Sequence, residues 1–350
     1  MYSICSKQRI NLSRQAEETI RYDIECFAED SEKVKFGGAV NRIFRVYCHR
    51  AQANISAAMS VEQRKLETLL ASLKADDEAK KELIMCLLEK KEQELTQAAM
   101  RLAKKKAAPN PTTLYVQDDI REYLESSDVL QLVGKHYKNT WQYIKAVIEE
   151  YAEKPYIERE SIFFDDIIHK IKYAGENRQI VSSGRNRYLV RPYGIETDTL
   201  STYNYLVGYS SKIRGDGKAE ASENLASFRI ARISNVVALD DVCPLSAEER
   251  DAISNAIIEK GVQFLVGDQT EIKVRLTENG LREYKKQITW RPMNNKIKSA
   301  GNELVFFCTE WQALIYFFKF GKEVEIISPD NLRSRFQNMH SEAAMVYGSL

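Results

Sequence analysis

Arginine and tyrosine side chains are interleaved through the stretch between residues 178 and 237. Lys and Arg outnumber Asp and Glu there, most of the basic residues are Arg, and five tyrosines lie among them: Tyr188, Tyr193, Tyr203, Tyr205 and Tyr209. A guanidinium group binds a phosphate through two parallel hydrogen bonds, and a tyrosine ring stacks on an unpaired base. This combination predicts binding of single-stranded nucleic acid. The alternative is that the tyrosines are core and the arginines pair with nearby acids, which suits single residues better than the whole group.

A second set of polar side chains alternates with apolar ones near the start of the chain. Lys7, Arg9 and Asn11 share one face of a predicted strand, and Ile10 and Leu12 share the other. Apolar residues then recur twice at helical spacing, before and after a pair of glycines. The segment therefore predicts a strand followed by two helices.

A strand without a partner leaves its backbone hydrogen-bonding groups unpaired. The strand at residues 7–12 is therefore predicted to pair with the same strand of a second copy, unless a strand-like stretch at residues 113–116 supplies a partner. The order of elements resembles the ribbon-helix-helix family, whose paired strands lie in the major groove of DNA. The resemblance implies a homodimer whose Lys7, Arg9 and Asn11 contact nucleic acid. The alternative is a helical hairpin with a frayed N-terminus.

No sequence motif indicates catalysis. The chain has no GxxxxGK[ST] phosphate loop, no HExxH zinc motif and no GxGxxG after a strand, and its four histidines lie in separate segments. The acidic pairs at residues 165–166 and 240–241 have no accompanying His or Cys that would complete a metal site. We therefore expect no enzymatic activity, no catalytic residues, no metal and no cofactor.

Long helices are predicted after the first segment. Residues 60–106 are rich in Glu, Lys, Leu, Ala and Gln and contain no Gly or Pro, which predicts helices that act as a spacer or a dimer surface. Pro109 and Pro111 then mark a linker. Residues 111–156 repeat the order strand, helix, helix, so they are either a degenerate second ribbon-helix-helix unit or a generic helical pair.

The segment between residues 157 and 242 combines one predicted helix with five short strands. Gly and polar residues separate the strands, which suggests a small curled barrel of antiparallel strands. Three strings in it resemble the signature stretches of the WYL domain: RYLVRPYG from Arg187, NYLVGY from Asn204 and FRIARI from Phe228. The sequence departs from the namesake Trp-Tyr-Leu at its first position, where Asn204 stands.

The resemblance implies an Sm-like barrel that senses or binds nucleic acid or a nucleotide-like ligand and catalyses no reaction. Carried over by position, it implies a ligand site made of Arg187, Tyr205, Arg229 and Arg232, and we expect Tyr188 and Arg191 of the first string to belong to the same site. Arg229 and Arg232 are three residues apart, so in a regular strand they face opposite sides unless a bulge intervenes. One of them would then bind the ligand, and the other would brace the fold.

The C-terminal part, residues 243–350, is similar to the extension that follows WYL domains in bacterial regulators. Trp290-Arg291-Pro292 and the aromatic run from Phe317 to Phe320 carry this similarity. Together with Trp311, the aromatic run is expected to form an apolar cluster that adds a dimer contact.

Composition limits the class of protein. A length of 350 residues favours two or three domains, and the apolar fraction of 44% is typical of a folded protein. A net charge of +1 excludes a uniformly basic nucleic-acid coat. The six cysteines include no CxxC pair, and no apolar stretch is long enough to cross a bilayer. We therefore expect a cytoplasmic protein.

These features together predict an α+β protein with an N-terminal ribbon-helix-helix unit, a helical spacer, a WYL barrel and an α+β extension. The expected divisions are 1–55, 56–110, 111–156, 157–242 and 243–350. The expected function is non-enzymatic binding of single-stranded RNA or DNA. A ribbon-helix-helix unit joined to a WYL domain resembles the accessory protein found beside RNA-targeting type VI-D CRISPR effectors, whose effector would then be a partner.

Two other functions compete with this expectation. One is a dimeric transcriptional regulator that binds duplex DNA and senses a ligand through its WYL domain. The other is a scaffold that only joins two copies of itself to a partner protein.

Overall fold

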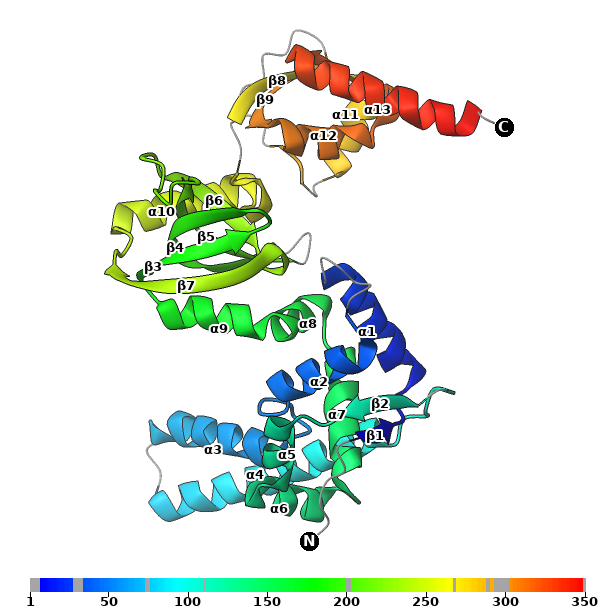
Figure 1. Cartoon of the computed structure of the whole chain (residues 1–350), viewed down its shortest axis with the longest axis vertical. Coiled ribbons are helices and arrows are strands. Elements are labelled where there is room, and N and C mark those ends of the chain that lie inside the picture. Colours follow the sequence, from blue (N-terminus) through cyan, green and yellow to red (C-terminus); the bar gives the residue numbers. More distant parts are fainter. Residues whose placement is uncertain are drawn as a thin grey trace. The chain divides into compact units, whose positions relative to one another are not determined.

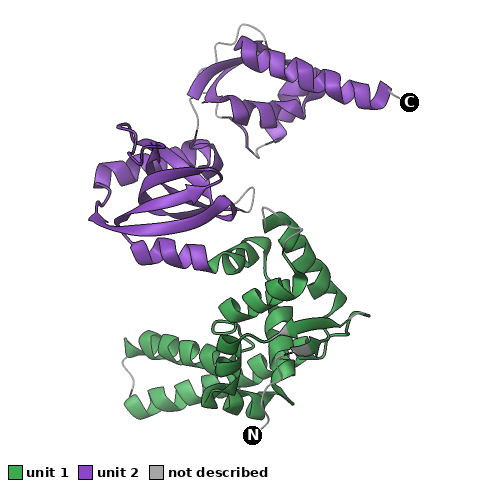
Figure 2. Cartoon of the chain, in the orientation of Figure 1, with its two compact units in different colours: residues 1–165 green, residues 166–350 purple. Residues whose placement is uncertain are grey.

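The computed structural model describes residues 7–27, 34–72, 76–109, 111–198, 203–266, 269–287, 290–292 and 302–348. The chain divides into two compact units, residues 1–165 and 166–350 (Figure 2). It combines helices with several small antiparallel sheets, in agreement with the predicted mixture of helix and sheet. Among the residues described, none of the helices combines the length and the apolar character needed to span a bilayer.

The N-terminal unit consists of helices and one two-stranded ribbon, which lies at an edge of the unit in Figure 1. Its elements are β1 (Lys7–Ile10), α1 (Arg14–Phe27), α2 (Phe36–Tyr47), α3 (Ile55–Ala71), α4 (Asp77–Ala103), β2 (Thr112–Tyr115), α5 (Asp118–Glu125), α6 (Ser127–His136), α7 (Thr140–Glu153) and α8 (Tyr156–Phe163). The apolar residues of α1 recur every three or four positions, so that one stripe of this helix is buried.

The strand predicted at the start of the chain is present as β1, and its partner is β2 of the same chain. The two strands are antiparallel, with Arg9 opposite Thr113 and Ile10 opposite Thr112. The prediction that β1 pairs with a second copy is therefore wrong, and the alternative partner at residues 113–116 is the one used. The physical reason is that β2 already satisfies the backbone groups that would otherwise need another copy.

Helix α7 carries two buried carboxylates that attach the ribbon and α2 to it. Glu149 accepts hydrogen bonds from the backbone N–H and the hydroxyl of Ser13, both at 2.6 Å. Glu150 accepts from the hydroxyl of Tyr47 at 2.6 Å and from the N–H of Ala53 at 2.8 Å. Because Ser13 lies between β1 and α1, and Tyr47 ends α2, the two carboxylates fix these elements on one helix.

The C-terminal unit contains two sheets. The first part comprises α9 (Asp165–Ala174), β3 (Asn177–Ser183), β4 (Asn186–Asp198), β5 (Tyr203–Ile213), β6 (Asn224–Arg229), the 3-10 helix η2 (Ile230–Arg232), β7 (Ile233–Val242), α10 (Ala247–Lys260) and η3 (Val262–Phe264). The second part comprises β8 (Gln269–Leu276), α11 (Glu278–Lys286), β9 (Glu303–Thr309), α12 (Glu310–Phe318), η4 (Gly321–Glu323), β10 (Val324–Ser328) and α13 (Asp330–Gly348).

The larger sheet has the strand order β6-β5-β4-β3-β7, and every neighbouring pair is antiparallel. The register between β4 and β5 shifts between Pro192 and Gly194. Gly208 of β5 lies opposite this irregularity, where a Cβ atom would collide with the carbonyl oxygen of Arg191. A glycine is therefore needed for β5 to approach β4 at this point.

The predicted strand over residues 228–233 is not continuous in the structure. Strand β6 ends at Arg229, the turn η2 occupies residues 230–232, and β7 begins at Ile233. A single strand across this segment is therefore a wrong prediction. The β-branched and aromatic composition of the segment favours a strand, but the chain turns there to take β7 to the opposite edge of the sheet.

The smaller sheet has the order β10-β8-β9 and supports a core of aromatic side chains. Phe317 and Phe320 of the predicted apolar cluster are buried in this core, and Phe318 packs against it. Trp311 is 57% exposed. The cluster that was expected to add a dimer contact is therefore mostly the core of the extension, because α12 turns its aromatic side toward the sheet.

Candidate nucleic-acid interface

One face of the five-stranded sheet carries Arg191, Tyr205 and Arg229 together with several tyrosines. In the ladder between β5 and β6, Tyr205 is directly opposite Arg229, and in the ladder between β4 and β5, Arg191 is directly opposite Tyr209. Side chains of residues paired across a ladder lie on the same face, and Tyr205 and Tyr209 are four residues apart on β5. Arg191, Tyr205 and Arg229 therefore share that face.

Helix α10 and η3 cover the middle of this face. Val207 of β5 forms a buried cluster with Ile253 of α10 and Val262 of η3, and Tyr205 and Tyr209 pack against it. We call this side of the sheet the α10 face. Its two ends differ in chemistry, because different side chains surround Arg191 and Arg229.

Arg229 stacks on an aromatic ring at one end of the α10 face. Its guanidinium carbon lies 3.5 Å from the centroid of the Tyr203 ring, which is the geometry of a cation–π contact. Tyr205 is directly opposite Arg229 on the next strand. Arg229, Tyr203 and Tyr205 are all half-buried, so their positions are fixed while part of each side chain remains accessible. We call these three residues the Arg229 cluster.

Arg191 is held by two carboxylates at the other end. Its guanidinium donates to both oxygens of Glu249, at 2.6 and 3.2 Å, and to Glu223 at 2.9 Å. The pKa of Arg191 is raised above its ordinary value, first by the hydrogen bond with Glu249. The same hydrogen bond lowers the pKa of Glu249 to about 2. Because Glu249 also caps α10 through Ser246, the ion pair attaches the start of this helix to β4.

Arg187 and Tyr188 lie apart from the Arg229 cluster. Arg187 is exposed and opposite Ile213, eight residues along β5 from Tyr205, which corresponds to about 26 Å of strand. Tyr188 projects from the opposite face of the sheet, where its ring centroid lies 4.9 Å from that of Phe228. Tyr188 is therefore a packing residue of the other face rather than a neighbour of Tyr205.

Arg232 is the last residue of the turn η2 and is exposed. Arg229 and Arg232 do not belong to one strand, because η2 lies between Arg229 and β7. The expectation that they face opposite sides of a regular strand therefore does not apply. Arg229 belongs to the α10 face, whereas Arg232 lies beyond the turn at the start of β7.

The ribbon residues belong to the N-terminal unit. Arg9 is exposed on β1, and Asn11 is exposed directly after this strand. Lys7 pairs with Tyr115 in the backbone ladder. On the partner strand, Thr113 faces the same side as Arg9, so the basic residues of the ribbon come from β1 alone.

Tyr203 is the member of the cluster that sequence reasoning left out of the site. Its position two residues before Tyr205 was the available signal, because residues i and i+2 of a strand share a face. The contact with Arg229 follows only from the pairing of β5 with β6. In the described part of the chain, no three His, Cys, Asp or Glu side chains are grouped so that they could hold a metal ion.

No protein-family model matches the chain, and no curated protein matches it in sequence. Among solved structures, the chain is similar to the crystal structure of a CRISPR Cas-related protein, with a TM-score of 0.74 and 22% identity over 100% of this chain and 96% of that chain. It also matches the proteasome accessory factor B/C of Arthrobacter aurescens, with a TM-score of 0.28 and 10% identity over 67% of this chain and 37% of that chain. The first similarity shows a shared fold along the whole chain, whereas a TM-score of 0.28 does not indicate one.

Proposed function

We propose that this chain binds single-stranded RNA through the Arg229 cluster on the α10 face. The observation that carries the proposal is the guanidinium group of Arg229, 3.5 Å from the centroid of the Tyr203 ring and opposite Tyr205. A guanidinium group binds phosphate, and aromatic rings stack on unpaired bases. An unpaired strand presents both groups side by side, whereas a duplex hides the faces of its bases.

Two further exposed arginines in the same part of the chain support the proposal. Arg232 follows Arg229 after one turn, and Arg187 is exposed farther along the sheet. We leave Arg191 out of the proposed interface, because two carboxylates already occupy its donors. Tyr188 is left out as well, because it packs on the opposite face.

The proposed biological role is that of an accessory protein of an RNA-targeting CRISPR effector of type VI-D. The fold shared with a CRISPR Cas-related protein supports a CRISPR context. The strings that resemble the WYL domain, together with the strand and helices that resemble a ribbon-helix-helix unit, support the accessory role. In this role the protein binds RNA and catalyses no reaction. It would act on an effector by delivering RNA to it or by contacting it directly.

A competition experiment tests the proposal. A fluorescent, unstructured RNA of about 15 nucleotides is bound to the full chain and displaced by unlabelled single-stranded RNA, single-stranded DNA or duplex of equal length. We expect the single strands to compete better than duplex, and affinity to fall as salt rises because bound phosphates release counterions. Tighter binding of duplex would contradict the proposal.

Duplex DNA is the second candidate ligand, and the ribbon favours it. One chain contains both paired strands, with Arg9 exposed on the ribbon. A ribbon that is complete in one chain needs no second copy to enter a groove. If duplex binds more tightly, Arg9→Ala is expected to cost about 1 to 3 kcal/mol where Arg9 contacts a base edge, and much less where it lies along the backbone.

The homodimer is part of the proposal and no longer depends on the ribbon. Sedimentation of the full chain at micromolar concentration measures it directly. A monomer that binds RNA with full affinity would remove the dimer from the proposal and leave the RNA interface unchanged.

A further inference from the structure

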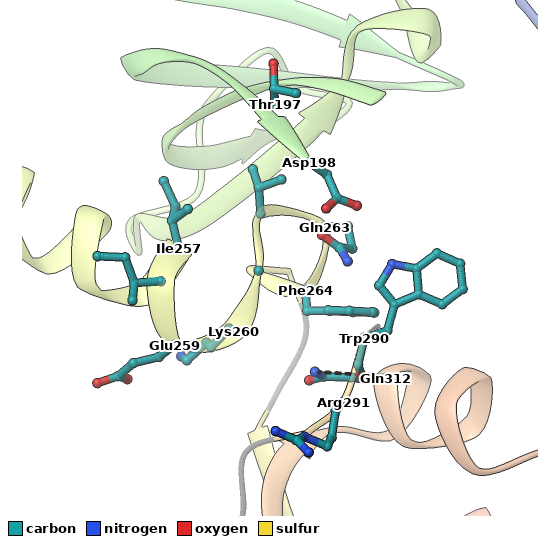
Figure 3. A pocket seen from close by; sticks show the side chains of 13 residues that line it. Thr197, Asp198, Ile257, Glu259, Lys260, Gln263, Phe264, Trp290, Arg291 and Gln312 are labelled. Carbon is teal, nitrogen blue, oxygen red and sulfur yellow. Dashed lines mark hydrogen bonds between the residues drawn. The ribbon is translucent and has the colours of Figure 1, made fainter. Parts of the chain in front are cut away.

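A pocket with a volume of about 290 Å³ lies at the end of β4, beside the turn between α10 and η3 (Figure 3). Asp198 of β4 and Gln263 and Phe264 of η3 line it, together with Trp290 and Gln312. Its volume is at the lower end of the range for small-ligand sites, so it suits one ring system rather than a long ligand.

Two buried polar atoms of the pocket have no hydrogen-bond partner among the described residues. They are the indole N–H of Trp290, which is a donor, and the side-chain oxygen of Gln263, which is an acceptor. In Figure 3 the indole nitrogen is on the side of its ring that faces Gln263 and Asp198. Buried polar groups are nearly always paired in folded proteins, so a ligand that offers an acceptor beside a donor would satisfy both atoms.

The backbone of Trp290 is strained in a way that holds the indole at the pocket. Its φ angle is 59°, in the left-handed region that bulky residues rarely adopt. The side-chain amide of Gln312 donates to the carbonyl oxygen of Trp290 at 3.4 Å, and Gln312 is itself only 4% exposed. Strain of this kind persists where surrounding structure fixes it, and it is concentrated at ligand sites.

The chemistry of the lining selects a planar, polar ligand. Trp290 and Phe264 provide aromatic walls, and Asp198, which is 6% exposed, places a carboxylate beside them. Lys260 and Arg291 add positive charge at the pocket. Nucleobases are flat and carry donors next to acceptors on their edges, and their phosphates are negative. We infer that this pocket holds one nucleobase of a single-stranded RNA.

The pocket adjoins the Arg229 cluster through the end of the β4–β5 ladder. Asp198 of the pocket is directly opposite Tyr203, the residue on which Arg229 stacks. A strand bound at the cluster can therefore place a neighbouring base in the pocket. The inference rests on the proposed function where it names RNA as the source of the base. Recognition of a base by Gln263 and Trp290 is independent of that function.

Tryptophan fluorescence tests the inference on the full chain. Trp141→Phe and Trp311→Phe leave Trp290 as the single reporter, since the chain has three tryptophans. The probes are an unstructured RNA of about 15 nucleotides, uridine and adenosine monophosphates, and ribose 5-phosphate, which has no base. We expect saturable quenching by the RNA, weaker quenching by the monophosphates and none by ribose 5-phosphate.

Gln263→Met removes the hydrogen-bonding amide at nearly constant volume. It is expected to weaken the quenching interaction with RNA roughly tenfold, the loss that one or two unmade hydrogen bonds produce. Gln337→Met is the matched control, because Gln337 is exposed on α13 of the same unit. Melting temperature is measured for both variants, and Gln263→Leu, which also lacks the side-chain oxygen, replaces Gln263→Met if the latter does not fold.

The outcomes separate this inference from the proposed function. If labelled RNA binds but Trp290 emission and the Gln263→Met affinity do not change, the pocket is not a base site and the RNA interface stands. If monophosphates quench Trp290 but RNA does not bind, the base pocket stands and the single-strand function is overturned. If neither RNA nor monophosphates bind, both are overturned.

Discussion

Arg191 and Arg229 lie on one face of one sheet and each lies over a tyrosine ring, but other contacts of their guanidinium groups differ. Arg191 donates to Glu249 and Glu223, and its side chain is only 12% exposed. Arg229 stacks on Tyr203 and faces Tyr205 across the ladder. The first arginine connects a helix to the sheet, whereas the second is placed among rings that a nucleic-acid base can share.

Residue type and strand face alone therefore do not decide what an arginine does. The groups around each guanidinium matter: Glu249 of α10 and Glu223 pair with Arg191, so a phosphate would have to displace them. Arg229 stacks on the Tyr203 ring, and a stacked guanidinium group can donate hydrogen bonds to a phosphate in its own plane.

The largest expected effect is on RNA affinity when Arg229 is changed. Arg229→Ala should weaken single-strand binding by about 1.5 to 3 kcal/mol, because a charged hydrogen bond to phosphate is lost. Arg229→Lys keeps the charge but not the planar stacking group, so it should recover only part of the affinity. Fluorescence anisotropy with labelled RNA measures both. Unchanged binding by Arg229→Ala would remove the contrast with Arg191.

The next effect concerns the ring opposite Arg229. Tyr205→Ala should cost about 1 to 3 kcal/mol of RNA affinity if a base stacks on the ring, whereas Tyr205→Phe should cost almost nothing because it keeps the aromatic face. Tyr205 also packs against the cluster under α10, so melting temperatures accompany the titrations. An equal loss with Ala and Phe would mean that the hydroxyl, and not stacking, makes the contact.

Arg191→Ala should change stability rather than binding. Loss of the ion pair with Glu249 releases the start of α10, and we expect the melting temperature to fall by about 2 to 4 °C, the shift that one ordinary interaction gives in a unit of this size. The affinity of the folded variant for RNA should stay within about twofold of that of the unsubstituted protein. This change is well below the tenfold loss that about 1.4 kcal/mol produces. A loss of affinity comparable to that of Arg229→Ala would place Arg191 in the interface.

The smallest expected effect is a change in the pKa of Glu249. Glu249 has a pKa of about 2 in the folded protein against an ordinary value of 4.5. Its ion pair therefore contributes stability that is fully present above pH 4.5 and is lost as pH falls toward 2. In Arg191→Gln, NMR of the carboxyl carbon should show the pKa returning toward 4.5. Part of the depression should remain, because Ser246 still donates to Glu249.

Local pattern predicted much of the fold. Alternation between residues 7 and 12 indicated a strand, which is present as β1, and helical spacing indicated the helices that follow it. The five strands between residues 177 and 242 were expected, apart from the turn η2 that divides one of them. These features depend on the period of apolar residues within a short segment, and a single sequence contains that information.

The periodicity of the sequence did not predict which distant residues contact one another. β1 pairs with a strand more than a hundred residues later, Arg191 meets a carboxylate 58 residues away, and Tyr188 packs on the face opposite Tyr205. A periodic pattern states which side of an element is apolar, but several distant elements can cover that side.

The sequence by itself determined that this chain has helices, short antiparallel strands and a stretch rich in arginine and tyrosine. Only the tertiary structure decided which carboxylate holds Arg191, which ring Arg229 contacts, and that Gln263 and Trp290 meet at one pocket. The physical reason is that charge compensation and stacking require contact within a few ångströms. Such contacts exist only after the chain has closed loops of tens to hundreds of residues, a step that no local propensity specifies.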